Sequence, residues 1–109
     1  MADNKNRTVH EALVTRILGG EGHASHEQRR AAFDNAGLRA PLRTLVDKVA
    51  MQPTRVTDED IAAVKAAGLS EDQIFELVVC AAVGQATRQY DTALAALAAA
   101  TTESRDRAS

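Results

Sequence analysis

The segment Ser70-Glu71-Asp72-Gln73-Ile74-Phe75-Glu76-Leu77-Val78-Val79-Cys80-Ala81-Ala82-Val83-Gly84 decides the fold of this chain. Its first four residues match a capping box, in which a serine hydroxyl and a glutamine side chain satisfy the free N–H groups of a helix start. The residues that follow are apolar on almost every side of the helix. A helix of this kind is buried all round, so we expect it to lie between its own chain and a second subunit.

Four shorter helices are predicted before this long one. Capping residues mark three of the starts, with capping boxes at Thr8 and Ser25 and a single cap at Thr57. Glycine follows the first, second and fourth helices, as is common at helix ends. The predicted ranges are Val9–Leu18, His26–Ala36, Pro41–Met51 and Asp58–Ala67, and the long helix runs from Glu71 to about Ala100.

The composition also indicates one helical domain. The 109 residues include 22 alanines and only three aromatic residues, and alanine is the strongest helix former. We expect an all-α domain over residues 8–101, with flexible ends at residues 1–7 and 102–109. Because alanine offers little apolar area, we expect the chain to gain burial as a homo-oligomer.

Charge, hydropathy and cysteine usage exclude several classes of function. The formal net charge of −2 argues against a nucleic-acid-binding surface. No apolar run is long enough to cross a bilayer and the N-terminus is polar, so we expect a cytoplasmic protein with no membrane partner. The single cysteine, Cys80, allows neither an intrachain disulfide nor a metal site built on a cysteine pair.

Two adjacent stretches resemble a known family. Residues 66–74 read Ala-Ala-Gly-Leu-Ser-Glu-Asp-Gln-Ile, and residues 76–84 read Glu-Leu-Val-Val-Cys-Ala-Ala-Val-Gly. This turn, acidic cap and long apolar helix resemble the carboxymuconolactone decarboxylase-like, or alkylhydroperoxidase D-like, family. The resemblance extends over residues 42–97 and implies a helical oligomer of five or so helices.

The redox motif of that family is missing from this chain. Redox members carry Cys-x-x-Cys-x-x-x-His, and the family's spacing back from Gly68 places those three residues at Pro53, Val56 and Asp60. Proline and valine form neither a thiolate nor a disulfide, and an aspartate does not replace a neutral imidazole at neutral pH. Thiol peroxidase activity is therefore not expected, and no cofactor is implied.

A few polar residues remain as candidates for chemistry. Cys80 lies in the most apolar window, where we expect an inert thiol that packs as a small hydrophobe. Glu76 and Arg88 interrupt the same helix, and we expect each to form an ion pair between helices or subunits. The alternative is a general acid or base at Glu76, whose pKa burial would raise. With Asp60 and Arg55, these two would serve a cofactor-free lyase or isomerase.

The histidines give a weaker indication. His23 and His26 follow the glycine-rich residues 19–22 and could bind zinc together with Glu21. Because His-x-x-His spacing is common, we expect exposed histidines and no metal, with the zinc site as the alternative. Nothing in the sequence around His10 suggests catalysis. The favoured function is an oligomeric interaction, ligand-binding or accessory-subunit protein, whose partners are a second copy, another protein or a small apolar ligand.

Overall fold

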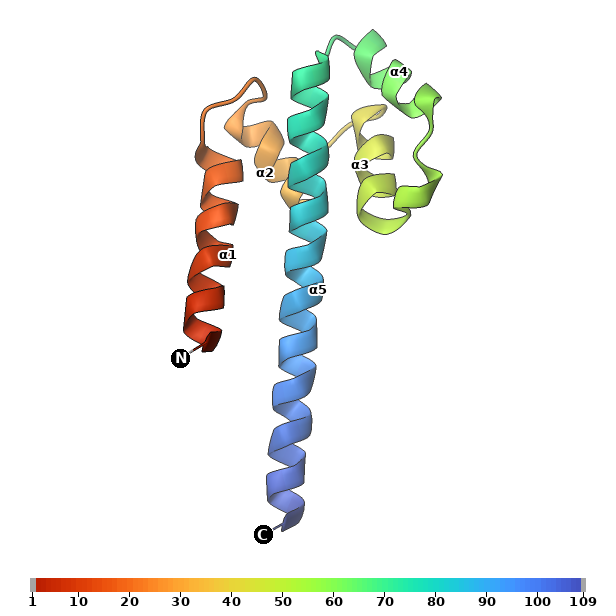
Figure 1. The fold of residues 1–109 in the computed structure, drawn as a ribbon. Coiled ribbons are helices and arrows are strands. Elements are labelled where there is room, and N and C mark those ends of the chain that lie inside the picture. Colours follow the sequence, from red (N-terminus) through yellow and green to blue (C-terminus); the bar gives the residue numbers. More distant parts are fainter. Residues whose placement is uncertain (1, 109) are drawn as a thin grey trace.

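The computed structural model describes the backbone of residues 2–108 and the side chains of residues 7–102, and this part of the chain consists of helices joined by loops and turns (Figure 1). The elements are α1 (Ala2–Gly19), α2 (His26–Asp34), α3 (Leu42–Met51), a 3-10 turn (Pro53–Arg55), α4 (Asp58–Ala66) and α5 (Glu71–Ala108). No strand occurs within residues 2–108, so the predicted all-α class is confirmed. None of the described helices has the length and apolar character needed to cross a bilayer.

Helix α5 is the spine against which the other four helices pack. Figure 1 shows α1 and α2 along one side of its first half and α3 and α4 along the other. The core side chains come from all of these elements except α1: Ala32 and Phe33 of α2, Leu45 and Val46 of α3, Val64 of α4, and Leu77, Cys80 and Ala81 of α5. The long helix is thus the element that the core depends on, as predicted.

Burial of α5 is incomplete within the chain. Phe75 is 69% exposed, and Ala82 is also exposed, although both belong to the segment expected to be covered all round. The four neighbouring helices therefore cover only part of the circumference of α5. Its second half projects beyond them, which makes the molecule elongated at 62 × 28 × 21 Å (Figure 1).

Local capping signals locate three of the helix starts correctly. Ser25 and Ser70 each accept a hydrogen bond at 3.1 Å from the backbone N–H three residues on, and Thr57 does so at 3.2 Å. At Ser70 the Gln73 side chain returns the contact, so the predicted capping box is complete. Capping residues mark helix starts because they satisfy N–H groups that have no partner within the helix.

The predicted ends of the first and last helices are wrong. Helix α1 begins at Ala2, so Thr8 lies within it and the capping box predicted there does not form a helix start. Helix α5 continues to Ala108 and passes the expected end near Ala100. The flexibility expected for the two ends of the chain stays a prediction, and Met1 and Ser109 lie outside the described residues.

Helices α2 and α5 approach each other closely at Gly84. A Cβ atom placed on this residue would overlap the backbone carbonyl of Phe33, so only a glycine permits the contact. One turn further along α5, Arg88 Nη1 donates a hydrogen bond of 2.5 Å to the same carbonyl. Among the described residues Arg88 forms no ion pair of the kind expected, and its guanidinium group instead contacts the negative end of α2.

We predict that Gly84→Ala destabilises the protein by about 1–3 kcal/mol, because the new methyl group forces α2 and α5 apart. Gly19→Ala is the matched control, since its added Cβ meets no atom within 4 Å. Urea unfolding of the two variants measures the difference. Equal unfolding midpoints for Gly84→Ala and the wild type would show that the crossing is looser than the structure indicates.

Candidate functional site

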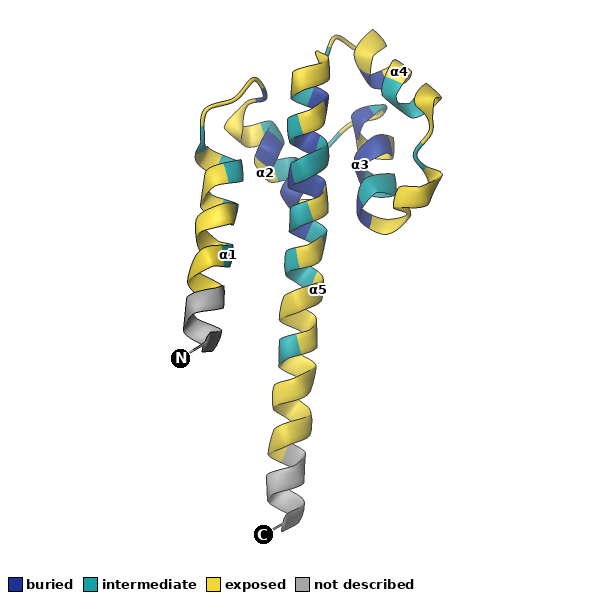
Figure 2. Cartoon of the chain, in the orientation of Figure 1, coloured by how far each residue is buried: buried dark blue, intermediate teal, exposed yellow. Residues whose placement is uncertain are grey.

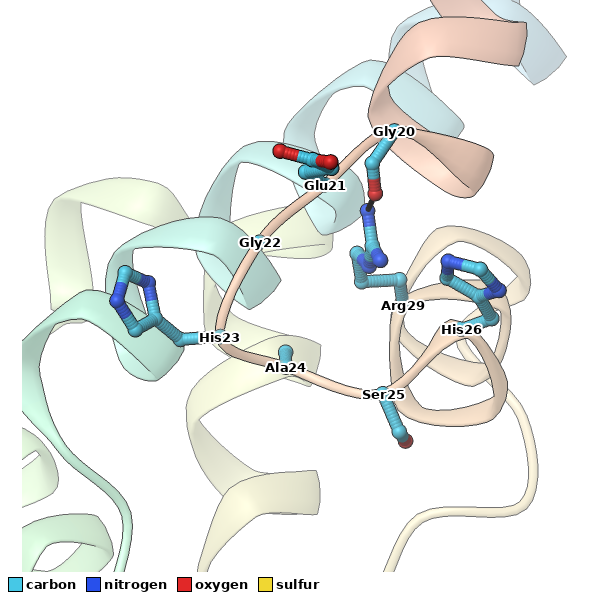
Figure 3. A pocket seen from close by; sticks show the side chains of 8 residues that line it. All are labelled: Gly20, Glu21, Gly22, His23, Ala24, Ser25, His26 and Arg29. Carbon is cyan, nitrogen blue, oxygen red and sulfur yellow. Dashed lines mark hydrogen bonds between the residues drawn. The ribbon is translucent and has the colours of Figure 1, made fainter.

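The loop between α1 and α2 lies against the first turns of α5 and forms the centre of the candidate site. It comprises residues 20–25, Gly-Glu-Gly-His-Ala-Ser (Figure 3). Two charged side chains from different helices bind its backbone. Glu76 of α5 accepts hydrogen bonds from its N–H groups, and Arg29 of α2 donates to a carbonyl at its start.

Glu76 is bound to two successive backbone N–H groups. The N–H of His23 lies 2.7 and 2.9 Å from the two carboxylate oxygens, and the N–H of Ala24 lies 2.6 Å from Oε2. The His23 ring nitrogen Nδ1 is 3.5 Å from Oε1. A Cβ on Gly22 would lie 2.5 Å from the same oxygen, so a glycine is needed for this approach.

These contacts keep the Glu76 carboxyl group ionised. Partial burial alone would raise its pKa, but the hydrogen bonds from Ala24 and His23 outweigh burial and hold the pKa below the ordinary value of 4.5. The raised pKa, on which the alternative of a general acid or base at Glu76 rested, is therefore wrong. Glu76 is instead an anionic acceptor that fixes the loop.

Arg29 is the buried charged residue of the site. Its side chain is only 4% exposed, and Nη1 donates to the carbonyls of Gly20 at 2.7 Å and Ile17 at 3.3 Å. Its Nε has no hydrogen-bond partner among the described residues, and no described carboxylate lies within ion-pair distance. The carbonyls at the end of α1 therefore satisfy part of the guanidinium group but leave its charge without a counter-ion.

Cys80 lies on the face of α5 that meets α1, close to Arg29 of α2. Its Sγ is 3.7 Å from the carbonyl of Ile17, and the residue is fully buried, as expected. Burial raises the pKa of the Cys80 thiol above its ordinary value, and the nearby positive charge of Arg29 offsets only part of this effect. The thiolate is therefore disfavoured at neutral pH.

A cleft of about 510 Å³ opens between α1 and α5 beside these residues. Its apolar wall is formed by Leu13, Ile17, Phe75, Val79 and Cys80. Its polar lining consists of Gly20, Glu21, Arg16, Arg29 and Glu76. We call this space the α1–α5 cleft.

The two loop histidines do not come together. Figure 3 shows the His23 ring on the loop and the His26 ring at the start of α2, well apart from each other. His23 approaches Glu76 and, at 3.9 Å, Asp72. Among the side chains of residues 7–102, no group of three or more histidine, cysteine, aspartate or glutamate residues is arranged to hold a metal ion.

The residues proposed for a cofactor-free enzyme are also dispersed. Asp60 accepts hydrogen bonds from Lys48 Nζ at 2.8 and 2.9 Å and from the Thr57 N–H at 2.9 Å, which together hold its pKa below 3.8. Arg55 is exposed on the 3-10 turn, and Arg88 binds the end of α2. Of these four candidates only Glu76 lines the α1–α5 cleft, so the cleft does not assemble their chemistry.

A second cleft, of about 650 Å³, contains a histidine whose role the sequence did not indicate. His10 Nε2 lies 3.0 Å from the Thr87 hydroxyl, which itself donates to the Val83 carbonyl at 2.7 Å. Since a hydroxyl has one hydrogen, the Nε2 atom of His10 must be the donor, which leaves Nδ1 as the acceptor of the neutral ring. The ring also stacks on Tyr90, with centroids 6.1 Å apart.

Arg29 is the second residue of the site whose burial is not predicted from the sequence. Adjacent Arg30 is exposed and pairs with Asp34, whereas Arg29 shares a buried face with Ala32 and Phe33. That spacing of three and four residues is the signal by which a buried arginine could have been recognised.

Comparison of the chain with family models, with curated proteins and with solved structures finds no match. The resemblance carried by residues 66–84 therefore stays a proposal.

We predict that Glu76→Gln lowers the free energy of unfolding by about 1–3 kcal/mol at pH 7, since it removes an ionised acceptor from two backbone N–H groups. Because the folded state lowers the pKa of Glu76, its contribution is present above pH 4.5 and is lost as the pH falls through the folded-state value. Urea unfolding at a series of pH values should therefore show the two proteins converging in acid.

Glu11→Gln is the matched control for this experiment, because Glu11 is an exposed carboxylate on α1 and the change is of the same kind. A Glu76→Gln penalty that stays constant from pH 7 to acid, or that is absent at pH 7, would contradict the assignment of Glu76 as an ionised loop acceptor.

Proposed function

We propose that this chain is a non-catalytic, self-associating helical protein, in which residues 89–102 of α5 pair with the same residues of a second copy. We call these residues the α5 rod. The observation that carries the proposal is the exposure of this segment. Leu94 is half-buried and all the other residues from 89 to 102 are exposed, as the colouring of α5 in Figure 2 shows.

The composition of the α5 rod does not suit a helix surrounded by water. Its single charged residue is Asp91, and its other residues include Leu94, Leu97 and six alanines. Surface helices normally carry charged side chains on the face turned to solvent. A nearly uncharged helix with small side chains is typical of one that lies against another helix at close range.

A second copy is the partner that suits this surface best. Five α5 residues repeat at alternating spacings of three and four, as in the seam of a coiled coil: Thr87, Tyr90, Leu94, Leu97 and Thr101. The seam continues the line that α1 already covers through His10, which contacts Thr87 and Tyr90. Because the α5 rod carries only one charge, two copies of it repel each other little. For the same reason it has no charge complementarity to a strongly charged partner.

We further propose that the chain is a non-redox relative of the carboxymuconolactone decarboxylase-like family and acts in the cytoplasm. Support comes from the turn at Gly68, where φ is +108°, and from the capped apolar helix that follows it. Non-redox character rests on Pro53, Val56 and Asp60, which stand where the family's thiols and imidazole would be. The lyase or isomerase alternative is less favoured, because only one of its candidate residues lines the α1–α5 cleft.

Leu97→Glu tests the proposal, because it places a charge within the seam. Leu97 and Val9 are both 64% exposed, so Val9→Glu on α1 is the matched control. Analytical ultracentrifugation should give wild-type masses that are multiples of 11.6 kDa. We expect Leu97→Glu to weaken association at least about tenfold, and Val9→Glu to leave it unchanged.

Two results would contradict the proposal. A wild-type protein that sediments as a single 11.6 kDa species at the highest concentration reached would exclude self-association. Dissociation by Val9→Glu but not by Leu97→Glu would move the interface from the α5 rod to α1.

A further inference from the structure

The buried guanidinium group of Arg29 is the starting point, because it has no counter-ion among the side chains of residues 7–102. The residue is 4% exposed, its Nη1 is shared between two carbonyls, and its Nε has no acceptor among the described residues. Burying a charge is costly unless an opposite charge or a full set of hydrogen bonds compensates it. A buried polar group that lines a cleft without a full set of hydrogen bonds calls for an explanation, and a bound ligand is one that fits a concave, largely apolar site.

The other charged residues of the α1–α5 cleft are Arg16, Glu21 and Glu76, and neither glutamate forms an ion pair with Arg29. The Glu76 carboxylate is bound to the N–H groups of His23 and Ala24 and forms no pair with Arg29. Arg16 and Glu21 carry opposite charges and are both exposed. An anionic group on a ligand would therefore find a cation whose charge is not already neutralised.

The rest of the cleft is apolar. Ile17 and Val79 are half-buried, whereas Phe75 is 69% exposed and Leu13 is 47% exposed. Large exposed apolar side chains that gather around a concave surface mark a binding site more often than a plain surface does. The volume of about 510 Å³ lies in the range of small-molecule sites.

We propose that the α1–α5 cleft binds a small molecule with one carboxylate and an apolar body. The carboxylate is held by Arg29 and the apolar body lies between Leu13 of α1 and Phe75 of α5. A carboxylate matches a single buried guanidinium group, whereas a phosphate dianion calls for more donors than this mostly apolar cleft provides. The site is formed within one chain, so it does not depend on the self-association proposed above.

Isothermal titration calorimetry with octanoate, 1-octanol and inorganic phosphate tests the inference. Octanoate should bind at least about tenfold more tightly than octanol, which has the same chain without the charge, and phosphate should not bind. Arg29→Met should abolish that preference while octanol binding remains. Phe75→Ala should weaken both ligands, because it removes an apolar wall of the cleft.

Two exposed residues outside the cleft provide controls: Met51→Ala for the loss of apolar surface and Arg43→Met for the loss of charge. Neither should change octanoate binding. If Arg29→Met fails to fold, the octanoate-to-octanol ratio and the effect of Phe75→Ala still decide the matter. Equal affinities for octanoate and octanol, phosphate binding as tight as octanoate, or octanoate binding unaffected by Phe75→Ala would each overturn the proposal.

The same titrations on Leu97→Glu separate this inference from the proposed function. Octanoate binding that survives in a dissociated Leu97→Glu protein supports the cleft within one chain. Octanoate binding that disappears on dissociation would show that the cleft of one chain is not the binding site.

Discussion

The contact between the Glu76 carboxylate and the N–H groups of His23 and Ala24 is the interaction on which the candidate site depends. It joins the long helix to the loop that connects α1 and α2. Arg29 binds the other polar groups of this turn, because its guanidinium group donates hydrogen bonds to the carbonyls of Ile17 and Gly20. An anion thus satisfies the N–H groups of this turn and a cation satisfies its carbonyls, which is how a partly buried loop meets its hydrogen-bonding requirement.

Helix α5 serves two purposes along its length. Its first half supplies Leu77, Cys80 and Ala81 to the core and meets α2 at Gly84, where the two backbones nearly touch. The α5 rod is exposed at every residue except Leu94 and carries one charged residue, Asp91. One continuous helix therefore carries both the intramolecular core and the surface proposed for self-association, so the site at one end is rigidly connected to the rod at the other.

The sequence predicts those features of the fold that depend on local chemistry. Capping at Ser25, Thr57 and Ser70 involves residues three apart, and a reader of the sequence can identify it. The same rule fails at Thr8, where a matching pattern lies inside a helix that begins six residues earlier at Ala2. A capping sequence marks a helix start only where the preceding residues are not themselves helical.

The candidate site could be predicted only in part, because its contacts join distant residues. Glu76 stands out as a carboxylate in an apolar helix, but its partners lie about fifty residues away, so its role as a backbone acceptor was not foreseen. The sequence does not distinguish the buried Arg29 from its exposed neighbour Arg30. His10 and Thr87, which form a hydrogen bond, are 77 residues apart in the sequence. Such contacts follow from the packing of helices, which no local pattern specifies.

Amide hydrogen exchange in the loop tests the central contact most directly. The N–H groups of His23 and Ala24 each have a carboxylate acceptor, whereas the structure shows none among the described residues for those of Glu21 and Gly22. We predict that the His23 and Ala24 amides exchange more slowly than their two neighbours in the wild type and lose this protection in Glu76→Gln. Exchange of all four amides at the same rate in the wild-type protein would contradict the account.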